Sequence, residues 1–223
     1  MIKTNDLVKV FRTDEVETTA LNKVNITVEK GEFVAIMGPS GCGKSTLLNI
    51  LGLLDTPSGG DYYFNGEEVA RYKEKQRTNL RKGNIGFVFQ EHLLLPHLTV
   101  RENILLPLLA SKHDHEELLQ KEKRAEELMV KTGISDLSSR YPSAISGGEA
   151  QRAALVRALV NTPSILLADE PTGSLDAKSA DIMGELLSEM NKEAGITMIL
   201  ATHSEKLALK MSKTLNLGNG KLY

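Results

Sequence analysis

Residues 38–45 read GPSGCGKS, and they follow the apolar run FVAIM at residues 33–37. The run has the length and composition of a short buried strand, and residues 45–51 are predicted to begin a helix. A strand, a glycine-rich loop and a helix in this order form the context in which the pattern G-x-x-x-x-G-K-[ST] cradles phosphate groups. The stretch therefore predicts a phosphate-binding loop within an α/β fold.

The residue types of this loop suit the phosphates of a nucleotide. Glycines let backbone N–H groups turn inward, and the N-terminus of the following helix adds partial positive charge. Lys44 is expected to reach the β- and γ-phosphates, and the hydroxyl of Ser45 to bind Mg²⁺. Cys42 stands at an unspecified position of the pattern and is assigned no chemistry of its own. The nucleotide-binding residues expected here are Gly38, Ser40, Gly41, Cys42, Gly43, Lys44, Ser45 and Thr46.

Composition narrows the class of protein. The chain has 223 residues, a formal net charge of −2 and one cysteine, which excludes an internal disulfide. The near-neutral charge gives no global basic field, so nucleic acid is not an expected partner. No apolar run approaches the ~18–20 residues that span a bilayer, and the start has no signal-peptide core. The chain is expected to be soluble, with any membrane role requiring a partner.

The expected order of elements is that of an α/β fold with an inserted helical part. The βαβ alternation predicts a mainly parallel sheet. A polar loop is expected at residues 12–19, and a β hairpin around residues 62–64. Other strands are expected at residues 7–11, 24–28, 33–37, 86–89, 165–168 and 198–202, and helical patterns at residues 116–131, 149–160 and 179–193.

Polar residues follow four of the expected core strands. One strand enters the phosphate-binding loop, and the others end at Gln90, at Asp169 with Glu170, and at His203. Ligands of open α/β sheets bind beyond the carboxyl ends of the strands, so one nucleotide could meet all four groups. Asp169 suits Mg²⁺, directly or through water, and Glu170 suits the water that attacks the γ-phosphate. The alternatives are a solvated acidic pair, a structural histidine and an ordinary loop glutamine.

Residues 146–152 read SGGEAQR and form a second motif. Ser146 can cap a helix, with Glu149 at the capping-box position, so one interpretation is a well-capped helix. The other is a second anion-binding helix N-terminus, where Gly147 and Gly148 permit close approach to a phosphate. The residues alone leave open why one nucleotide would need two such helix ends.

Together the motifs resemble the nucleotide-binding subunit of an ABC transporter, over essentially the whole chain. The resemblance implies a P-loop NTPase (RecA-like) core with an antiparallel β subdomain at residues 1–92 and 161–223. It also implies an α-helical subdomain at about residues 93–160, carrying the signature motif. By the same resemblance Gln90 is the Q-loop residue and a Mg²⁺ ligand, Asp169 the Walker B aspartate and Glu170 the catalytic glutamate. Asp176 matches the D-loop, His203 the switch histidine, and Phe11 the aromatic residue that stacks on adenine.

The resemblance also implies an assembly. Two subunits dimerise head to tail, with each ATP between the Walker A loop of one and the signature serine and glycines of the other. Such ATPases catalyse ATP hydrolysis with Mg²⁺ and are coupled to transport. Glutamate at position 149 stands where many members have glutamine, and Ile145 replaces the usual leucine.

A narrower resemblance is to the LolD/MacB/FtsE group, and residues 86–109 and 168–176 carry it. It implies a membrane permease of the LolCE, MacB or FtsX type and a place at the cytoplasmic side of a bacterial inner membrane. The work would be lipoprotein release or export of antibiotics or peptides. An FtsE-like ATPase regulating cell division, and a soluble ABC ATPase without transport, remain alternatives. Residues 90–103 are the expected docking segment; the alternative for Leu93, Leu94, Leu95 and Leu98 is a place in the helical core.

Overall fold

A computed structural model describes residues 1–13, 16–110 and 114–223. Part of the expected loop at residues 12–19, namely residues 14–15, lies outside the described residues. In the described part of the chain, no helix has both the length and the apolar character needed to cross a membrane.

The central sheet has six strands in the order β10-β9-β3-β8-β7-β6. The four inner strands β3, β8, β7 and β6 are parallel, so their carboxyl ends lie at one edge. Helices cover both faces of this sheet, and its strands accordingly read as continuous apolar runs. The strand bounds are β3 (Phe33–Met37), β6 (Ile85–Val88), β7 (Ile165–Asp169), β8 (Thr197–Thr202), β9 (Lys213–Gly218) and β10 (Lys221–Leu222).

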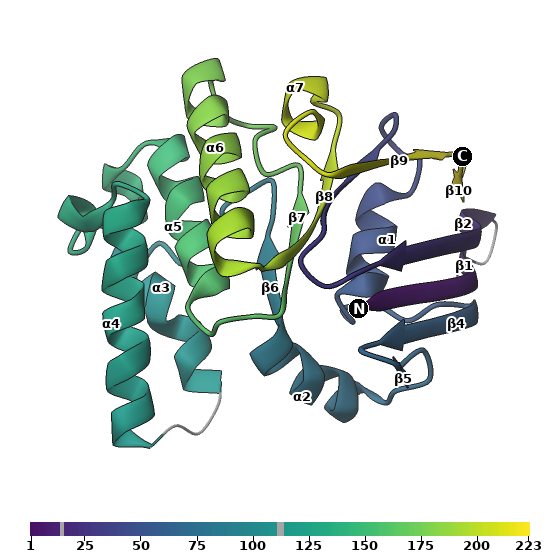
Figure 1. Ribbon diagram of the computed structural model, residues 1–223, viewed down its shortest axis with the longest axis horizontal. Coiled ribbons are helices and arrows are strands. Elements are labelled where there is room, and N and C mark those ends of the chain that lie inside the picture. The colour runs from purple at the N-terminus through teal and green to yellow at the C-terminus, as the bar shows by residue number, and fades with distance from the viewer. Residues whose placement is uncertain (14–15, 111–113) are drawn as a thin grey trace.

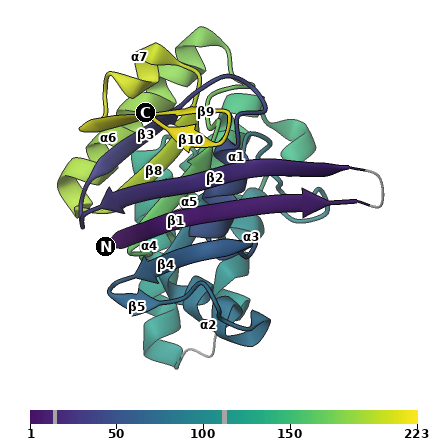
Figure 2. The same cartoon turned by 90° about the vertical axis from the view of Figure 1, so that its right-hand side faces the viewer.

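A second, antiparallel sheet has the order β2-β1-β4-β5. Its strands are β1 (Ile2–Arg12), β2 (Glu17–Val28), β4 (Gly59–Phe64) and β5 (Glu67–Glu68). Helix α1 (Lys44–Leu51) lies between the two sheets, as Figures 1 and 2 show from two directions. Its buried leucines join both sheets in one hydrophobic cluster, where the buried Tyr62 hydroxyl donates to the Leu51 carbonyl at 2.6 Å. The helix that follows the phosphate-binding loop is thereby held on two sides.

The other helices pack mainly on the opposite face of the central sheet (Figure 1). Successive residues of a strand point to opposite faces of the sheet and so join different hydrophobic clusters. In β7, Leu166 and Ala168 pack with these helices, whereas Ile165 and Leu167 pack with α1. The helix bounds are α3 (Val100–Leu105), η1 (Leu106–Ala110), α4 (His115–Lys131), η2 (Ser135–Leu137), η3 (Pro142–Ala144), α5 (Gly147–Leu159), α6 (Ala177–Ala194) and α7 (Glu205–Ala208).

The observed elements differ from the sequence-based expectation in several places. The helices α2 (Glu74–Asn84) and α7 and the strands β9 and β10 were not expected, and residues 17–19 of the expected polar loop belong to β2. The leucines after β6 divide: Leu94 is in the core, whereas Leu93 and Leu95 are about half exposed. The α/β class with its β and helical additions is confirmed, and α3 to α5 all fall within residues 93–160.

Candidate active site

The four expected groups line one cavity of about 470 Å³ at the carboxyl edge of the central sheet. β3 leads into the phosphate-binding loop, β6 toward Gln90, β7 to Asp169 and Glu170, and β8 to His203. Parallel pairing of these strands brings together residues that are up to 165 positions apart in the sequence, from Gly38 to His203. The lining residues are Ala20, Gly38, Pro39, Ser40, Gly41, Gly43, Lys44, Ser45, Thr46, Gln90, Asp169, Glu170 and His203.

Glycines at two positions of the loop are required by its shape. Gly38 has φ 156°, and a Cβ there would lie 2.1 Å from the carbonyl oxygen of Leu217. Gly43 has φ 107°, and its Cβ would lie 2.5 Å from the carbonyl oxygen of Ala20. Gly43 also caps α1, and within the described part of the chain this cap makes no side-chain hydrogen bond to the first N–H groups of the helix. These N–H groups and the helix dipole form an anion site open to the cavity.

Lys44 is buried and turned back over its own loop. Its Nζ donates to the carbonyl oxygens of Gly38 at 2.9 Å and Pro39 at 3.3 Å, and lies 3.7 Å from Oε1 of Glu170. The ammonium group thus lies at the cavity with a carboxylate that is near but not hydrogen-bonded to it. It can still bind a phosphate oxygen.

Asp169 has the properties of a metal ligand. Its Oδ1 is buried and has no hydrogen-bond partner among the described residues. Burial, followed by the charge of Glu170, raises the pKa of this carboxyl, while the hydroxyl of Ser45 and the charge of Lys44 act in the opposite direction. An unanswered carboxylate oxygen beside a hydroxyl is the oxygen donor set that Mg²⁺ prefers. The residues present therefore fit a magnesium ion.

Glu170 and His203 form a pair at the ends of neighbouring strands. Oε2 of Glu170 lies 2.9 Å from Nδ1 of His203 and accepts a hydrogen bond from the His203 backbone N–H at 3.2 Å. Glu170 has φ 46°, in the left-handed region, and its own N–H donates to the Ala201 carbonyl at 2.9 Å. This backbone turn separates the direction of the Glu170 side chain from that of Asp169, so adjacent carboxylates reach different parts of the cavity.

The second motif does form a helix N-terminus, but not in this cavity. Ser146 caps α5, and Oε2 of Glu149 accepts from the Ser146 N–H at 2.7 Å and from its hydroxyl at 2.8 Å. These bonds lower the pKa of Glu149. Gly148 is buried against α6, where a Cβ would lie 2.7 Å from Oγ of Ser179. The helix end is therefore satisfied within the chain and lies on the surface.

Several expected nucleotide-binding residues do not line the cavity. Phe11 is 46% exposed, with Nζ of Lys9 5.0 Å above its ring. Cys42 is buried behind the loop, and Asp176 caps α6 through a bond from the Ser179 N–H. Ala20 and Pro39 line the cavity although they were not predicted to. Pro39 lies within the loop pattern, so the pattern could have predicted its place in the cavity. Ala20 belongs to β2, and no motif around it indicates that it lines the cavity.

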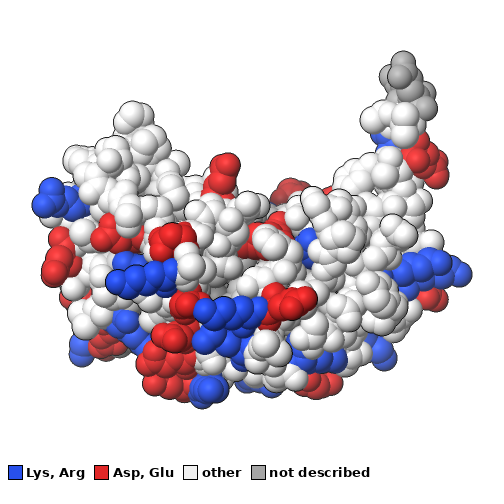
Figure 3. Space-filling model, turned by 90° about the horizontal axis from the view of Figure 1, so that it is seen from above, with Lys and Arg blue, Asp and Glu red and all other residues white. Residues whose placement is uncertain are grey.

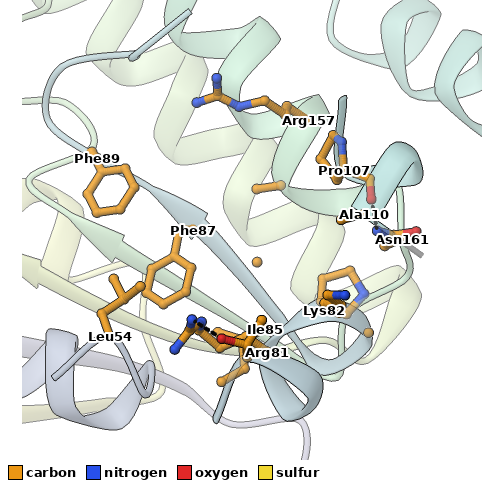
Figure 4. A pocket seen from close by; sticks show the side chains of 15 residues that line it. Leu54, Arg81, Lys82, Ile85, Phe87, Phe89, Pro107, Ala110, Arg157 and Asn161 are labelled. Atoms are coloured by element: carbon orange, nitrogen blue, oxygen red, sulfur yellow. Dashed lines mark hydrogen bonds between the residues drawn. The ribbon is translucent and has the colours of Figure 1, made fainter. Parts of the chain in front are cut away.

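A second hollow, of about 420 Å³, lies between β6 and α5 (Figure 4). The rings of Phe87 and Phe89 are stacked with centroids 5.7 Å apart, and the side chain of Arg157 lies on the other side of the hollow. Burial lowers the pKa of Arg157, whose guanidinium donates to the carbonyl oxygens of His92 and Leu93, both at 2.7 Å.

The sequence of the chain is similar to those of known proteins. The family profile described as ABC transporter matches residues 21–173. An uncharacterized ABC transporter ATP-binding protein of Methanocaldococcus jannaschii is 43% identical over 222 residues, covering 100% of this chain and 97% of the relative. The lipoprotein-releasing system ATP-binding protein LolD 1 of Rhodopseudomonas palustris is 44% identical over 207 residues, covering 93% of this chain and 91% of that protein.

Solved structures are similar over the whole chain. The dimeric structure of MJ0796, described as a bacterial ABC transporter cassette, has a TM-score of 0.90 and 39% identity, covering 100% of this chain and 96% of that one. A post-hydrolysis dimer of MJ0796 bound to ADP and Pi has a TM-score of 0.89 and 36% identity, with the same coverage.

Proposed function

Since this chain belongs to the ATP-binding proteins of ABC transporters and is an ATPase of that family, we propose that it drives a membrane permease through ATP-dependent pairing of two copies. One observation supports this most directly. Four strand ends surround a phosphate-binding loop in one cavity, while a second helix N-terminus suited to phosphate lies outside it. The single chain therefore holds two halves of a site that do not face each other.

In the proposed reaction each of the predicted site residues has a separate role. The N–H groups of α1 and the ammonium of Lys44 hold the β- and γ-phosphates. Ser45, Asp169 and Gln90 would hold Mg²⁺, which would neutralise charge on the phosphates when bound. Glu170 accepts the proton of the attacking water, and His203, paired with it at 2.9 Å, orients that carboxylate and the γ-phosphate. Phe11 stacks on the adenine, and Asp176 contributes at the interface between the two copies.

We retain the division of the chain into a core at residues 1–92 and 161–223 and a helical subdomain at about residues 93–160. The Ser146, Gly147 and Gly148 end of α5 then serves the ATP bound by the partner copy. A phosphate arriving there would meet the helix dipole of α5 at an exposed site.

Mixing two inactive variants tests the composite site. Lys44→Ala removes one loop cation, and Ser146→Arg blocks the α5 end. In a mixed dimer one site joins the intact loop of the second chain to the intact α5 end of the first, so part of the hydrolysis should return if one site suffices. The measurement is phosphate release by each variant and by the mixture, with differently tagged chains to show that mixed dimers form. Mixed dimers without activity would contradict a site shared between copies.

The hollow beside β6 is the proposed docking place of the permease. Among the described residues it is lined by the cations Arg81, Lys82 and Arg157, by apolar side chains and by no carboxylate. It suits a short cytoplasmic helix of a LolCE-, MacB- or FtsX-like partner that carries apolar residues and an acid. Half-exposed Leu93 and Leu95 lie in the segment that Arg157 holds. On the face in Figure 3 basic and acidic residues are interspersed, with no continuous basic area in that view.

We therefore place the protein at the cytoplasmic side of a bacterial inner membrane, held there by its partner. Leu95→Asp puts a charge on the docking segment and should release the protein from membranes of its own cells without loss of ATPase activity. Leu209→Asp changes a leucine outside this segment that is still more exposed, at 86% against 49% for Leu95, and should leave membrane binding unchanged. Sedimentation with membranes is the measurement. Wild-type protein that never sediments with membranes would contradict the transport function itself.

A further inference from the structure

Gln90 is exposed, so its position in the cavity depends on how its backbone is held. The two carbonyl oxygens around it are each bound by a side chain from another element. Nε2 of Gln151, on α5, donates to the carbonyl oxygen of Phe89 at 2.7 Å. The hydroxyl of Ser174, in the loop after β7, donates to the carbonyl oxygen of Gln90 itself at 3.1 Å.

Gln151 is a buried polar residue without an assigned role. It is 1% exposed, and it lies five positions after Ser146 on the helix that Ser146 caps. A glutamine side chain in the interior is costly unless its amide is hydrogen-bonded, and this one bonds a carbonyl 62 residues away in the sequence. The bond thus joins the helix of the second motif to the last residue before Gln90.

Close packing makes this connection short and stiff. A Cβ on Gly86 of β6 would lie 2.4 Å from the carbonyl oxygen of Ala158 on α5. Further along, Arg157 of α5 binds the carbonyl oxygens of His92 and Leu93. Helix α5 therefore contacts the strand before Gln90, the residue next to it and the segment after it, so a movement of α5 would displace Gln90.

We infer that Gln151 is a positioning residue for Gln90: through the Phe89 carbonyl it sets where the Gln90 side chain stands relative to Mg²⁺. This inference rests on the proposed role of Gln90 as a magnesium ligand. Removing a group that holds a metal ligand in place lowers metal affinity by about 10- to 100-fold. Gln151→Met, which keeps the length of the side chain but has no N–H donor, should raise the Mg²⁺ concentration for half-maximal hydrolysis about tenfold. Binding of ATP without Mg²⁺ should be unchanged.

The experiment titrates Mg²⁺ against ATP hydrolysis by the purified protein in four variants. Gln90→Ala should raise the Mg²⁺ requirement, and Gln151→Met in the Gln90→Ala background should add nothing, because both changes act on the same contact. Thr197→Val is the control: its buried hydroxyl accepts from the Gly31 N–H at 2.9 Å at the opposite end of the sheet. It should lower the melting temperature and leave the Mg²⁺ requirement as in the wild type.

Two results overturn the inference in distinguishable ways. If Gln90→Ala raises the Mg²⁺ requirement and Gln151→Met behaves like Thr197→Val, Gln151 is a structural residue only. If Gln90→Ala changes nothing, the proposed magnesium role of Gln90 is wrong and the role of Gln151 falls with it. Gln151→Leu, which also lacks a hydrogen-bond donor, is subject to the same expectation and replaces Gln151→Met if that variant does not fold.

Discussion

The N-termini of α1 and α5 are both built to face an anion, but they differ in what satisfies them. At α1 the adjacent Lys44 has an incomplete ion pair, and among residues 1–13, 16–110 and 114–223 the glycine cap makes no side-chain bond and a buried oxygen of Asp169 has no partner. At α5 Ser146 and Glu149 satisfy each other in a capping box on the surface. One end is thus open inside a cavity, and the other is closed by its own carboxylate.

The two helix ends therefore differ in how much free energy a bound phosphate would gain. At the α1 end, ligand binding supplies missing partners for groups that are already buried, so the gain is large. In the proposed dimer, a phosphate at the α5 end would add to groups that are already satisfied, so the gain there would be small. On this view binding begins at α1, and α5 contributes when two chains close.

The largest effect is expected from removing the cation of the open end. Lys44→Ala should reduce ATP hydrolysis by about 10²–10³-fold or more and weaken ATP binding, because the donor facing the phosphates is lost. Phosphate release and ATP binding are the measurements, with circular dichroism to confirm the fold. Lys206→Ala, which removes a lysine paired with Asp181 outside the cavity, is the control and should retain activity. Wild-type turnover in Lys44→Ala would remove the basis for treating the α1 end as the nucleotide site.

The next largest effect separates chemistry from closure. Glu170→Gln keeps the shape of the side chain and loses the basic oxygen, which should slow hydrolysis by about 10²–10⁴-fold. Because ATP still binds, the variant should accumulate as an ATP-bound dimer, visible by gel filtration with and without ATP. A variant that stays monomeric and hydrolyses ATP at the normal rate would show that Glu170 has another task.

A smaller effect is expected at the closed end. Glu149→Gln keeps the capping box and removes the negative charge that an incoming phosphate would meet. Helix-end charge effects of about 0.3–1 kcal/mol correspond to a roughly two- to fivefold lower ATP concentration for half-maximal activity. Glu102→Gln changes the same capping-box position of α3, which Thr99 caps, and should leave that ATP concentration unchanged. An equal response in both variants would mean that the α5 end does not meet the nucleotide.

The smallest effect concerns the ligand-free protein. Burial raises the folded-state pKa of Asp169 above its unfolded value, so stability is lost as the pH rises from the unfolded pKa to the folded one, and the full cost is present above the folded pKa. Asp169→Asn removes this cost and should raise the melting temperature without ligand, most at alkaline pH and less as the pH falls. Asp176 is the counterpart: bonds from Ser179 lower its pKa, so Asp176→Asn should lower the melting temperature above the unfolded pKa. A lower melting temperature of Asp169→Asn at pH 8 would contradict the unsatisfied state of that carboxylate.

Most of the polar residues that line the cavity could be predicted, because they follow strands that the sequence marks by continuous apolar runs. The apolar runs at residues 33–37, 165–168 and 198–202 define parallel strands, and parallel strands bring their carboxyl ends to one edge. The family, the α/β class and the ATPase activity are accordingly confirmed. The individual roles of the site residues stay predictions.

What the sequence could not show depends on tertiary packing or on purely local polar contacts. Helix α2 has no fully buried residue: Leu80 packs against the core only in part, and Glu74 forms ion pairs with Arg77 and Arg81, so the helix carries no apolar stripe. Neighbouring leucines look alike in the sequence, although only Leu94 points into the core. The bond from Gln151 to Phe89 depends on how α5 lies against β6, and no spacing along the chain encodes it.

The strand order also constrains how the protein is made. Strand β3, which leads into the phosphate-binding loop, is paired on its two sides by β8 and β9, and the nearer of these begins 160 positions after β3 ends, from Met37 to Thr197. During synthesis the loop therefore leaves the ribosome long before either neighbour of its strand exists. Such distant pairing slows folding, and a nascent chain that ends before residue 197 leaves both edges of β3 open to association with other chains. The nucleotide site can be completed only after residues 197–218 have been translated, which makes termination before them a source of aggregation rather than of a partly active enzyme.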